Sequence, residues 1–222
     1  MFSTRKLGLC FLLLTIAPLM SQELRKVKCR FLSLDPSSQP PPMVNLGEEG
    51  AEVAIVVNSD YPSQPIGCFA NGNQLSFLRA DDKKPAALVT LPGAGSAFIL
   101  LFIQGPKKEG ALPWQVLVIE DSPKNFPEGG AYVVNFYKRD IRFTIGEHRV
   151  RLKPAGSSGV TKPKKLDSFN MGEVKFEFQV EEKWALADQT MLRFLPNVRY
   201  LMFAYIDPVT RRPAVRTCVD TK

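Results

Sequence analysis

The chain has 222 residues, enough for one large domain or two small ones, and its 29 Lys and Arg against 22 Asp and Glu give a net charge of +7. This mildly basic balance falls well short of the concentrated basic stretches of nucleic-acid-binding proteins, so we expect no nucleic-acid partner. The 18 prolines exclude a mainly helical protein, because each proline removes a backbone donor and blocks a helix interior.

The first 21 residues have the order of a secretory signal peptide. Arg5 and Lys6 precede an apolar run over residues 9–19, and a polar segment begins at Ser21. The run is too short for a membrane anchor, which needs about 20 apolar residues, and an uncleaved anchor is the alternative. We therefore predict residues 1–21 as a signal peptide, a secreted or periplasmic mature chain with 27 basic and 22 acidic residues, and no stable membrane span after cleavage.

The mature chain opens with basic and apolar residues in strict alternation, which predicts a strand with one wet and one buried face. The basic positions are Lys26, Lys28 and Arg30, and the apolar positions are Val27, Cys29 and Phe31. Cys29 thus belongs to the apolar face.

Three cysteines follow the predicted cleavage site, and they are Cys29, Cys68 and Cys218. Their wide spacing is neither a dense disulfide framework nor a metal motif, so at most one intramolecular bridge can form. A buried thiol at Cys29 is one interpretation, and a bridge from Cys29 to Cys68 or Cys218 is the other.

Short apolar runs and turn signals continue along the chain. Residues 98–103, 116–119 and 200–206 are apolar runs bounded by Gly, Pro or Asp, which is typical of strands in a sandwich core. Glycine-containing turns such as 71–73 separate neighbouring runs at hairpin spacing. The sequence predicts an all-β protein, an antiparallel β-sandwich.

A resemblance supports this fold in the second half of the chain. Gly129-Gly-Ala-Tyr-Val-Val-Asn-Phe136, followed by Ile141-Arg-Phe-Thr-Ile-Gly146 and Leu152-Lys-Pro-Ala-Gly156, resembles small secreted bacterial β-sandwich domains of unassigned function. It covers about 30 residues made of turn and core positions and carries no site. The resemblance implies the fold and export only.

The second half continues with strand patterns. Val150 and Leu152 alternate with Arg149, Arg151 and Lys153, and residues 174–180 alternate apolar with polar side chains. Between them, residues 156–165 are rich in Gly, Ser and Lys and predict a mobile loop. Residues 181–187 are the best helical candidate and predict one turn at most.

Two faint internal correspondences predict tandem modules. Residues 98–103 and 113–116 match residues 200–206 and 213–215 as closing hairpins, and residues 69–75 match 143–150 as a strand, glycine turn and strand. We predict two immunoglobulin-like modules, residues 22–121 and 122–222, with one larger sandwich as the alternative.

The tested catalytic arrangements are incomplete in this sequence. His148 is the only histidine, no G-x-S-x-G elbow exists, and Ser157-Ser158 has no oxyanion hole near it. One histidine and scattered cysteines provide no metal site, so we predict no cofactor. Acidic residues occur as adjacent pairs, which point to opposite faces of a strand and make poor glycosidase dyads. Trp114 and Trp184 are predicted as packing residues.

Basic side chains form the most prominent surface feature. Two predicted strand faces carry them, and their members are Lys26, Lys28, Arg30, Arg149, Arg151 and Lys153. If the faces are adjacent they attract an anion, whereas separate faces keep exposed strands from aggregating. The leading hypothesis is an exported, non-enzymatic binding or structural module whose partner is an anionic glycan, an envelope surface or a protein. The alternative is a carbohydrate-active protein, either a glycan-binding module or a two-carboxylate hydrolase.

Overall fold

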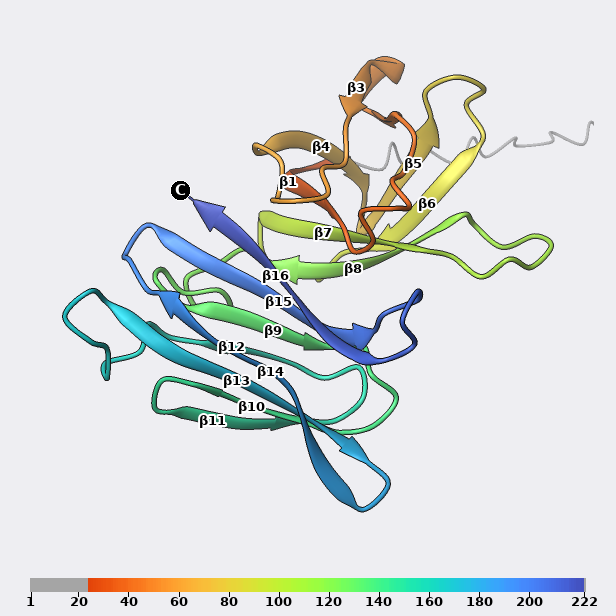
Figure 1. Ribbon diagram of the computed structural model, residues 1–222. Helices are drawn as coiled ribbons and strands as arrows, with labels where there is room; N and C mark the ends of the chain where they lie inside the picture. Colours follow the sequence, from red (N-terminus) through yellow and green to blue (C-terminus); the bar gives the residue numbers. More distant parts are fainter. Residues whose placement is uncertain (1–23, 222) are drawn as a thin grey trace, which may run out of the picture.

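The computed structural model describes residues 24–221, and these residues form an all-β protein (Figure 1). The predicted β-sandwich is confirmed. The predicted signal peptide, residues 1–21, lies outside the described residues. In the described part of the chain, no helix is both long and apolar enough to cross a membrane.

The first half of the chain forms one large sheet, sheet A. Its strands are β1 (Leu24–Ser33), β2 (Met43–Leu46), β3 (Glu52–Ile55), β4 (Ile66–Asn71), β5 (Gln74–Arg79), β6 (Pro85–Thr90), β7 (Ala97–Gln104) and β8 (Trp114–Glu120), with a short 3-10 helix, Glu48–Gly50, before β3. The order is β3-β2-β5-β4-β1-β7-β8, and β6 pairs with β5. A single residue pair, Asn71 with Gln74, joins β4 to β5 at the turn where Gly72 has a φ of 58°. Sheet A therefore folds into two four-stranded layers, β4-β1-β7-β8 and β3-β2-β5-β6.

The second half forms two separate four-stranded sheets. Sheet B has the order β12-β9-β15-β16, and sheet C has the order β11-β10-β13-β14. Their strands are β9 (Ala131–Asn135), β10 (Ile141–Ile145), β11 (His148–Leu152), β12 (Ser157–Val160), β13 (Met171–Val180), β14 (Lys183–Arg193), β15 (Val198–Ile206) and β16 (Pro213–Thr221).

The two halves repeat one strand order. When β9 to β16 replace β1 to β8, sheet B becomes layer β4-β1-β7-β8 and sheet C becomes layer β3-β2-β5-β6. The parallel pair β1–β7 recurs as β9–β15, so both halves depart from the purely antiparallel sandwich that we predicted. The division into modules at residue 121 stays a prediction.

The repeated order tests the two sequence correspondences. The closing hairpins match, because β7–β8 and β15–β16 occupy the same place in the two halves. The match of residues 69–75 with 143–150 is wrong, since these segments are β4–β5 and β10–β11, whereas the counterpart of β10–β11 is β2–β3. Both segments are strand–turn–strand units with a glycine turn, and such local similarity carries no information on sheet position.

A shared irregularity fixes the alignment of the halves. In the β5–β6 pair, Phe77 lies opposite Ala87 and Leu78 lies opposite Pro85, so one residue of β6 is skipped. In the β13–β14 pair, Phe176 lies opposite Asp188 and Glu177 lies opposite Leu186 in the same way. These β-bulges place Phe77 and Phe176 at equivalent positions.

Three apolar clusters hold the layers together. The first lies between the two layers of sheet A and includes Phe31, Phe77 and Phe102. The second lies between sheets B and C and includes Phe143 and Phe176. A third cluster joins the halves, where Leu32, Ile99 and Leu101 of sheet A pack against Leu201, Phe203 and Cys218 of sheet B. The order of layers is therefore sheet A, sheet B and sheet C, as Figure 1 shows.

Two predicted segments have a different structure. Residues 157–160 of the predicted mobile loop form β12, which pairs with β9, and the Glu147 carboxylate accepts hydrogen bonds from the backbone N–H groups of Lys164 and Lys165. The helical turn predicted at 181–187 is wrong. Val180 pairs with Lys183 across a two-residue turn, where Glu181 has a φ of 54°, and β14 follows at once. The turn has no Gly or Asn, which is why the sequence concealed it.

Candidate binding face on sheet C

The structure separates the two predicted basic faces. Lys26 and Lys28 are exposed on β1 in sheet A, whereas Arg149 and Arg151 are exposed on β11 in sheet C. Sheet B lies between these sheets. Lys153 follows the end of β11 and is exposed as well. The condition for one continuous patch, that the two basic faces are adjacent, is therefore not met.

Arg30 is a further correction, because its side chain is buried where the two halves meet. One face of β1 is exposed at Lys26 and Lys28. Further along the strand the same face is covered by sheet B, and Leu32 packs there in the cluster that joins the halves. There the Arg30 Nη2 atom donates to Asp220 Oδ1 at 2.5 Å, and its Nη1 atom lies 3.8 Å from Asp121 Oδ2. Arg30 is thus a structural cation in the described fold. The sequence signal missed this because Asp220 lies 190 residues away.

Arg199 completes this buried network. Its Nε atom donates to Asp220 Oδ2 at 2.9 Å and its Nη1 atom to Asp121 Oδ1 at 2.8 Å, while its guanidinium stacks 3.9 Å from the Phe126 ring centroid. Burial alone would raise the pKa of Asp220, but the hydrogen bond from Arg30 and the charges of Arg199 and Arg30 outweigh it and hold that pKa below its ordinary value. The network joins the halves and is closed to a large ligand.

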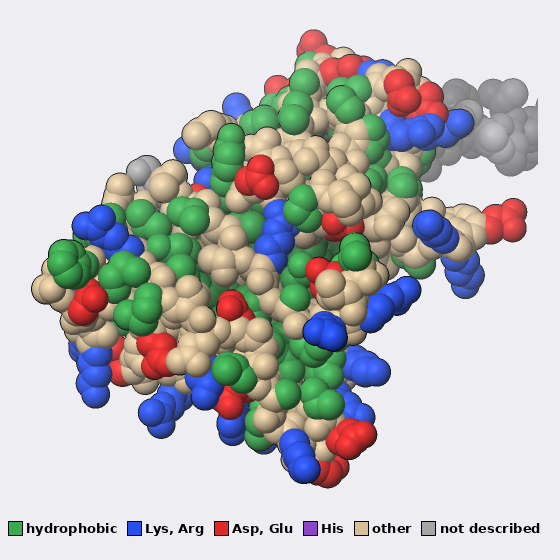
Figure 2. Space-filling view, viewed as in Figure 1, with side chains coloured by type: hydrophobic (Ala, Val, Ile, Leu, Met, Phe, Trp, Pro, Cys, Tyr) green, Lys and Arg blue, Asp and Glu red, His purple; other side chains and the backbone are tan. Residues whose placement is uncertain are grey.

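The outer face of sheet C carries the remaining candidate residues. The apolar side chains of β10, β11 and β13 point to the core, so the alternate residues point outward. Cross-strand register sets these outward residues in rows, with Arg151, Arg142 and Glu177 side by side in one row and Arg149, Thr144 and Lys175 in the next. Figure 2 shows Lys and Arg side chains projecting along the side of the molecule formed by sheet C, with acidic side chains between them.

Trp184 also lies on this face, contrary to the prediction that it packs in the core. It pairs with the outward-facing Gln179 on β13. The Arg142 guanidinium lies 4.7 Å from its ring centroid and that of Arg151 lies 5.5 Å from it. Trp114, in contrast, is buried in the first core as predicted. The turn at Glu181 explains why Trp184 faces outward. It reverses the chain just before Trp184, which lies near the start of β14 beside the outward-facing Gln179.

Ion pairs fix the first row of side chains. Arg142 donates from Nε and Nη2 to the two carboxylate oxygens of Glu177 at 2.6 and 2.8 Å, and Lys175 Nζ lies 3.6 Å from Glu177 Oε1. The hydrogen bond to Arg142 holds the pKa of Glu177 below its usual range and raises the pKa of Arg142. On the next strand, Arg151 Nε donates to Asp140 Oδ2 at 2.6 Å. Both guanidinium planes are thereby held close to the indole ring.

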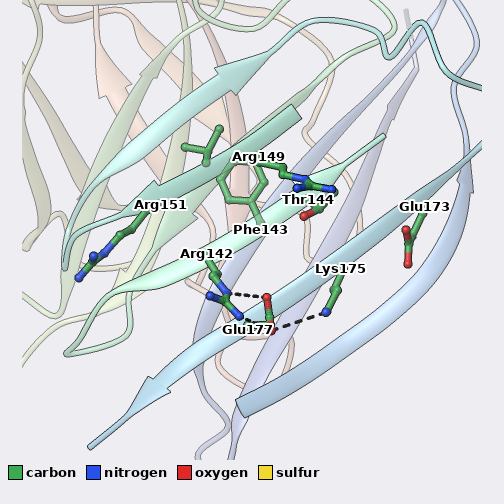
Figure 3. Close-up of a pocket in the computed structure, with 9 residues that line it drawn as sticks. Arg142, Phe143, Thr144, Arg149, Arg151, Glu173, Lys175 and Glu177 are labelled. Carbon is green, nitrogen blue, oxygen red and sulfur yellow. Dashed lines mark hydrogen bonds and ion pairs between the residues drawn. The ribbon is translucent and has the colours of Figure 1, made fainter. Parts of the chain in front are cut away.

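A shallow groove of about 610 Å³ follows this face (Figure 3). Four cations and two carboxylates line it, and these are Arg142, Arg149, Arg151, Lys175, Glu173 and Glu177. Across residues 24–221, the Arg149 side chain makes no hydrogen bond or ion pair with the protein, and in Figure 3 it lies on the strand beside the Arg142–Glu177 pair. The groove therefore has excess positive charge and one cation with free donors.

The catalytic candidates are not assembled. His148 Nε2 lies 3.8 Å from Glu147 Oε1 and 3.5 Å from Thr161 Oγ1, whereas the Ser157 hydroxyl lies 2.8 Å from that of Tyr132. The backbone N–H groups of Lys164 and Lys165 lower the pKa of Glu147 to about 2, so this carboxylate is a fixed acceptor. Within residues 24–221, no group of three His, Cys, Asp or Glu side chains converges as metal ligands would.

Known proteins give no direct assignment. The chain matches no protein-family model and no curated protein. The residues that line the groove are therefore the basis for a functional argument. Of these, sequence patterns named Arg149 and Arg151 as a candidate site but missed Arg142, and they also missed Trp184, whose ring lies beside Arg142 and Arg151. The alternation of residues 141–145 placed Arg142 outward, and only the hidden turn concealed Trp184.

Proposed function

We propose that the protein is an exported, non-enzymatic β-sandwich protein that binds an anionic glycan on the outer face of sheet C. The observation that carries this proposal is the groove lined by Arg142, Arg149 and Arg151, in which the Arg149 side chain has free donors. The Trp184 ring lies beside two of these guanidinium groups, those of Arg142 and Arg151. Arginine guanidinium groups form paired hydrogen bonds with carboxylate and sulfate-like groups. An aromatic ring beside them offers an apolar surface to a sugar ring.

The shape of the face favours a chain-like ligand. Side chains on one face of a strand are spaced about 6.7 Å apart, and neighbouring strands lie about 4.8 Å apart. The two rows of outward residues therefore form an open, flat surface that an extended polysaccharide can cross. A closed pocket for a small molecule would need walls that this sheet face does not have.

A hydrolase is less well supported by the same face. Glu173 and Glu177 are the two carboxylates that line the groove. At four residues apart on β13 they are separated by about 13 Å, beyond the roughly 6.5–9.5 Å of inverting glycosidases. Glu177 is also fully engaged by Arg142 and Lys175. We therefore propose binding without cleavage.

Retention on an immobilised acidic polysaccharide tests the proposal. The double variant Arg149→Glu and Arg151→Glu should lose retention, whereas Lys26→Glu with Lys28→Glu, which changes net charge equally on β1, should keep most of it. Wild-type retention should fall steeply with salt, because exposed charges are screened over about 10 Å at 0.1 M. Trp184→Ala should weaken retention on the acidic glycan as well.

The matched pair of variants makes the test decisive. Equal loss in both double variants would mean that net charge alone drives retention. Unchanged retention in the Arg149 and Arg151 variant would remove sheet C as the site. Melting temperatures of all variants should stay close to wild type, because these four side chains point away from the cores.

A further inference from the structure

Cys29 and Cys68 lie together on neighbouring strands in the first half. β1 and β4 are antiparallel, with Cys29 opposite Ile66 and Cys68 opposite Val27. The two cysteines are therefore diagonal neighbours on one face of the sheet, and both belong to the first apolar core. Each is 0% exposed.

The two thiols are in contact. Interaction with the Cys68 side chain, together with burial, raises the pKa of the Cys29 thiol. A disulfide between these diagonal neighbours needs their Cβ atoms about 3.8 Å apart, so the side chains and the local backbone of β1 and β4 would adjust to it. The raised pKa keeps Cys29 as a thiol in the folded protein, whereas thiolate is the species that reacts.

Cys218 is in a different position. It lies on β16 in the cluster between the halves, whereas Cys29 faces the first core on the opposite side of the β1 layer. Backbone therefore separates Cys218 from the other two thiols. All three cysteines are free in the described structure.

We propose that Cys29 and Cys68 become joined by a disulfide as the chain folds, and that Cys218 keeps its free thiol. The proposal rests on the export part of the proposed function, because disulfides persist in oxidising compartments. The bridge would close an apolar β1–β4 pair across a loop of about 40 residues, for which the stabilisation by a disulfide is substantial.

The oxidant is a disulfide of a small thiol or of an exchange protein. The thiolate of one cysteine attacks a sulfur of that donor, its S–S bond breaks, and a mixed disulfide forms while one donor thiolate leaves. The second cysteine thiolate then attacks the mixed disulfide, the Cys29–Cys68 bond forms and the second donor thiolate leaves. The pair loses two electrons to the donor, and the two protons of its thiols go to the departing thiolates. Because both thiols are fully buried in the folded core, where an oxidant does not reach them, this exchange occurs before β1 and β4 are enclosed.

Refolding in a glutathione redox buffer tests the bridge. The chain without its predicted signal peptide, residues 22–222, is unfolded in denaturant, reduced, refolded in oxidised and reduced glutathione, and then alkylated under denaturing conditions without reductant. Mass spectrometry should find one alkylated thiol, at Cys218, and a peptide pair joined through Cys29 and Cys68. Three alkylated thiols, or any bridge that includes Cys218, would overturn the proposal.

Variants and a second readout separate this result from the proposed function. Cys218→Ala should form the same bridge, and Cys68→Ala should leave two alkylated thiols. A bridge between Cys29 and Cys218 in Cys68→Ala would contradict the placement of Cys218. The bridged protein should also melt at a higher temperature than the reduced protein, and equal melting temperatures would exclude a stabilising bridge. Polysaccharide retention is measured independently, so its failure would leave the bridge in place.

Discussion

The two halves of the molecule share a strand order and a β-bulge but present different outer faces. The bulge makes Val44, Ala54 and Leu78 of the first half equivalent to Arg142, Arg151 and Glu177 of the second. The first row is apolar and the second is an ion row beside an indole ring. One backbone arrangement thus carries an apolar row in one half and a charged row in the other, so the fold does not require the charges of this row. Because the fold does not need these charges, we look for their role in ligand binding on sheet C.

The faces by which the two halves pack on each other differ from the outer faces, because there each half contributes an equivalent acidic residue. Phe98 opposite Glu120 and Tyr200 opposite Val219 are equivalent pairs of the closing hairpins, so the next residues, Asp121 and Asp220, are equivalent too. Both acids contact Arg30 and Arg199. Equivalent faces therefore pack on each other with an acid contributed by each half, an arrangement like that of a symmetric dimer within one chain.

The largest expected effect comes from breaking this inner network at its more buried acid. Asp220→Ala should destabilise the protein by roughly 3–5 kcal/mol, because it leaves Arg30 and the 1% exposed Arg199 without their main partner. Asp121→Ala should cost less, roughly 1–3 kcal/mol, since the 11% exposed Asp121 makes a single short contact. Urea denaturation measures both.

A surface acid serves as the control for these variants. Asp81 is 74% exposed beside Arg79, so Asp81→Ala should leave the denaturation midpoint unchanged. Equal destabilisation by Asp220→Ala and Asp121→Ala would show that the two acids contribute equally to the free energy of unfolding. Their difference in burial would then have no effect on stability.

Acid sensitivity sharpens the same comparison with a smaller effect. The folded protein holds the pKa of Asp220 below its unfolded value, so the ionised form stabilises the fold at pH 5 and above. This stabilisation is lost as the pH falls from about 4 toward the folded pKa, and each unit of depression contributes about 1.4 kcal/mol at neutral pH. Compared with wild type, Asp220→Asn should therefore be less stable at pH 7, and the difference should shrink by pH 3.

Urea midpoints of wild type and Asp220→Asn between pH 7 and pH 3 measure this difference. Other carboxylates titrate in both proteins and cancel. A gap of constant size across the range would mean that the Asp220 charge does not stabilise the fold.

The parts of this molecule that sequence reasoning could predict are those with local causes. Alternation over residues 27–31 and 174–180 depends on which side chains a single strand buries. Those strands and their inward residues are confirmed, except for Val180, which is exposed at the end of β13. The closing hairpins were also recognisable as a repeat.

The parts that failed depend on distant partners or on a concealed turn. Arg30 has the local pattern of an exposed residue, and only its contact with Asp220 makes it buried. Trp184 follows a turn formed by Glu181 and Glu182, which lack the usual turn chemistry. The parallel pairs β1–β7 and β9–β15 join strands from opposite ends of each half, and nothing in either strand alone specifies them.

Removal of the ion row of sheet C should change the melting temperature little but abolish retention on the acidic polysaccharide. The triple variant Arg142→Val, Arg151→Ala and Glu177→Leu gives sheet C the residues that the first half has at the same positions. All three charges lie on a solvent-facing sheet, where ion pairs add little to stability, so the melting temperature should move by less than about 4 °C. Retention on the acidic polysaccharide should be lost, because the guanidinium groups beside Trp184 are gone. If retention survives, the ion row only keeps an exposed sheet soluble, and if the melting temperature falls sharply, the row holds the second half together instead of serving a ligand.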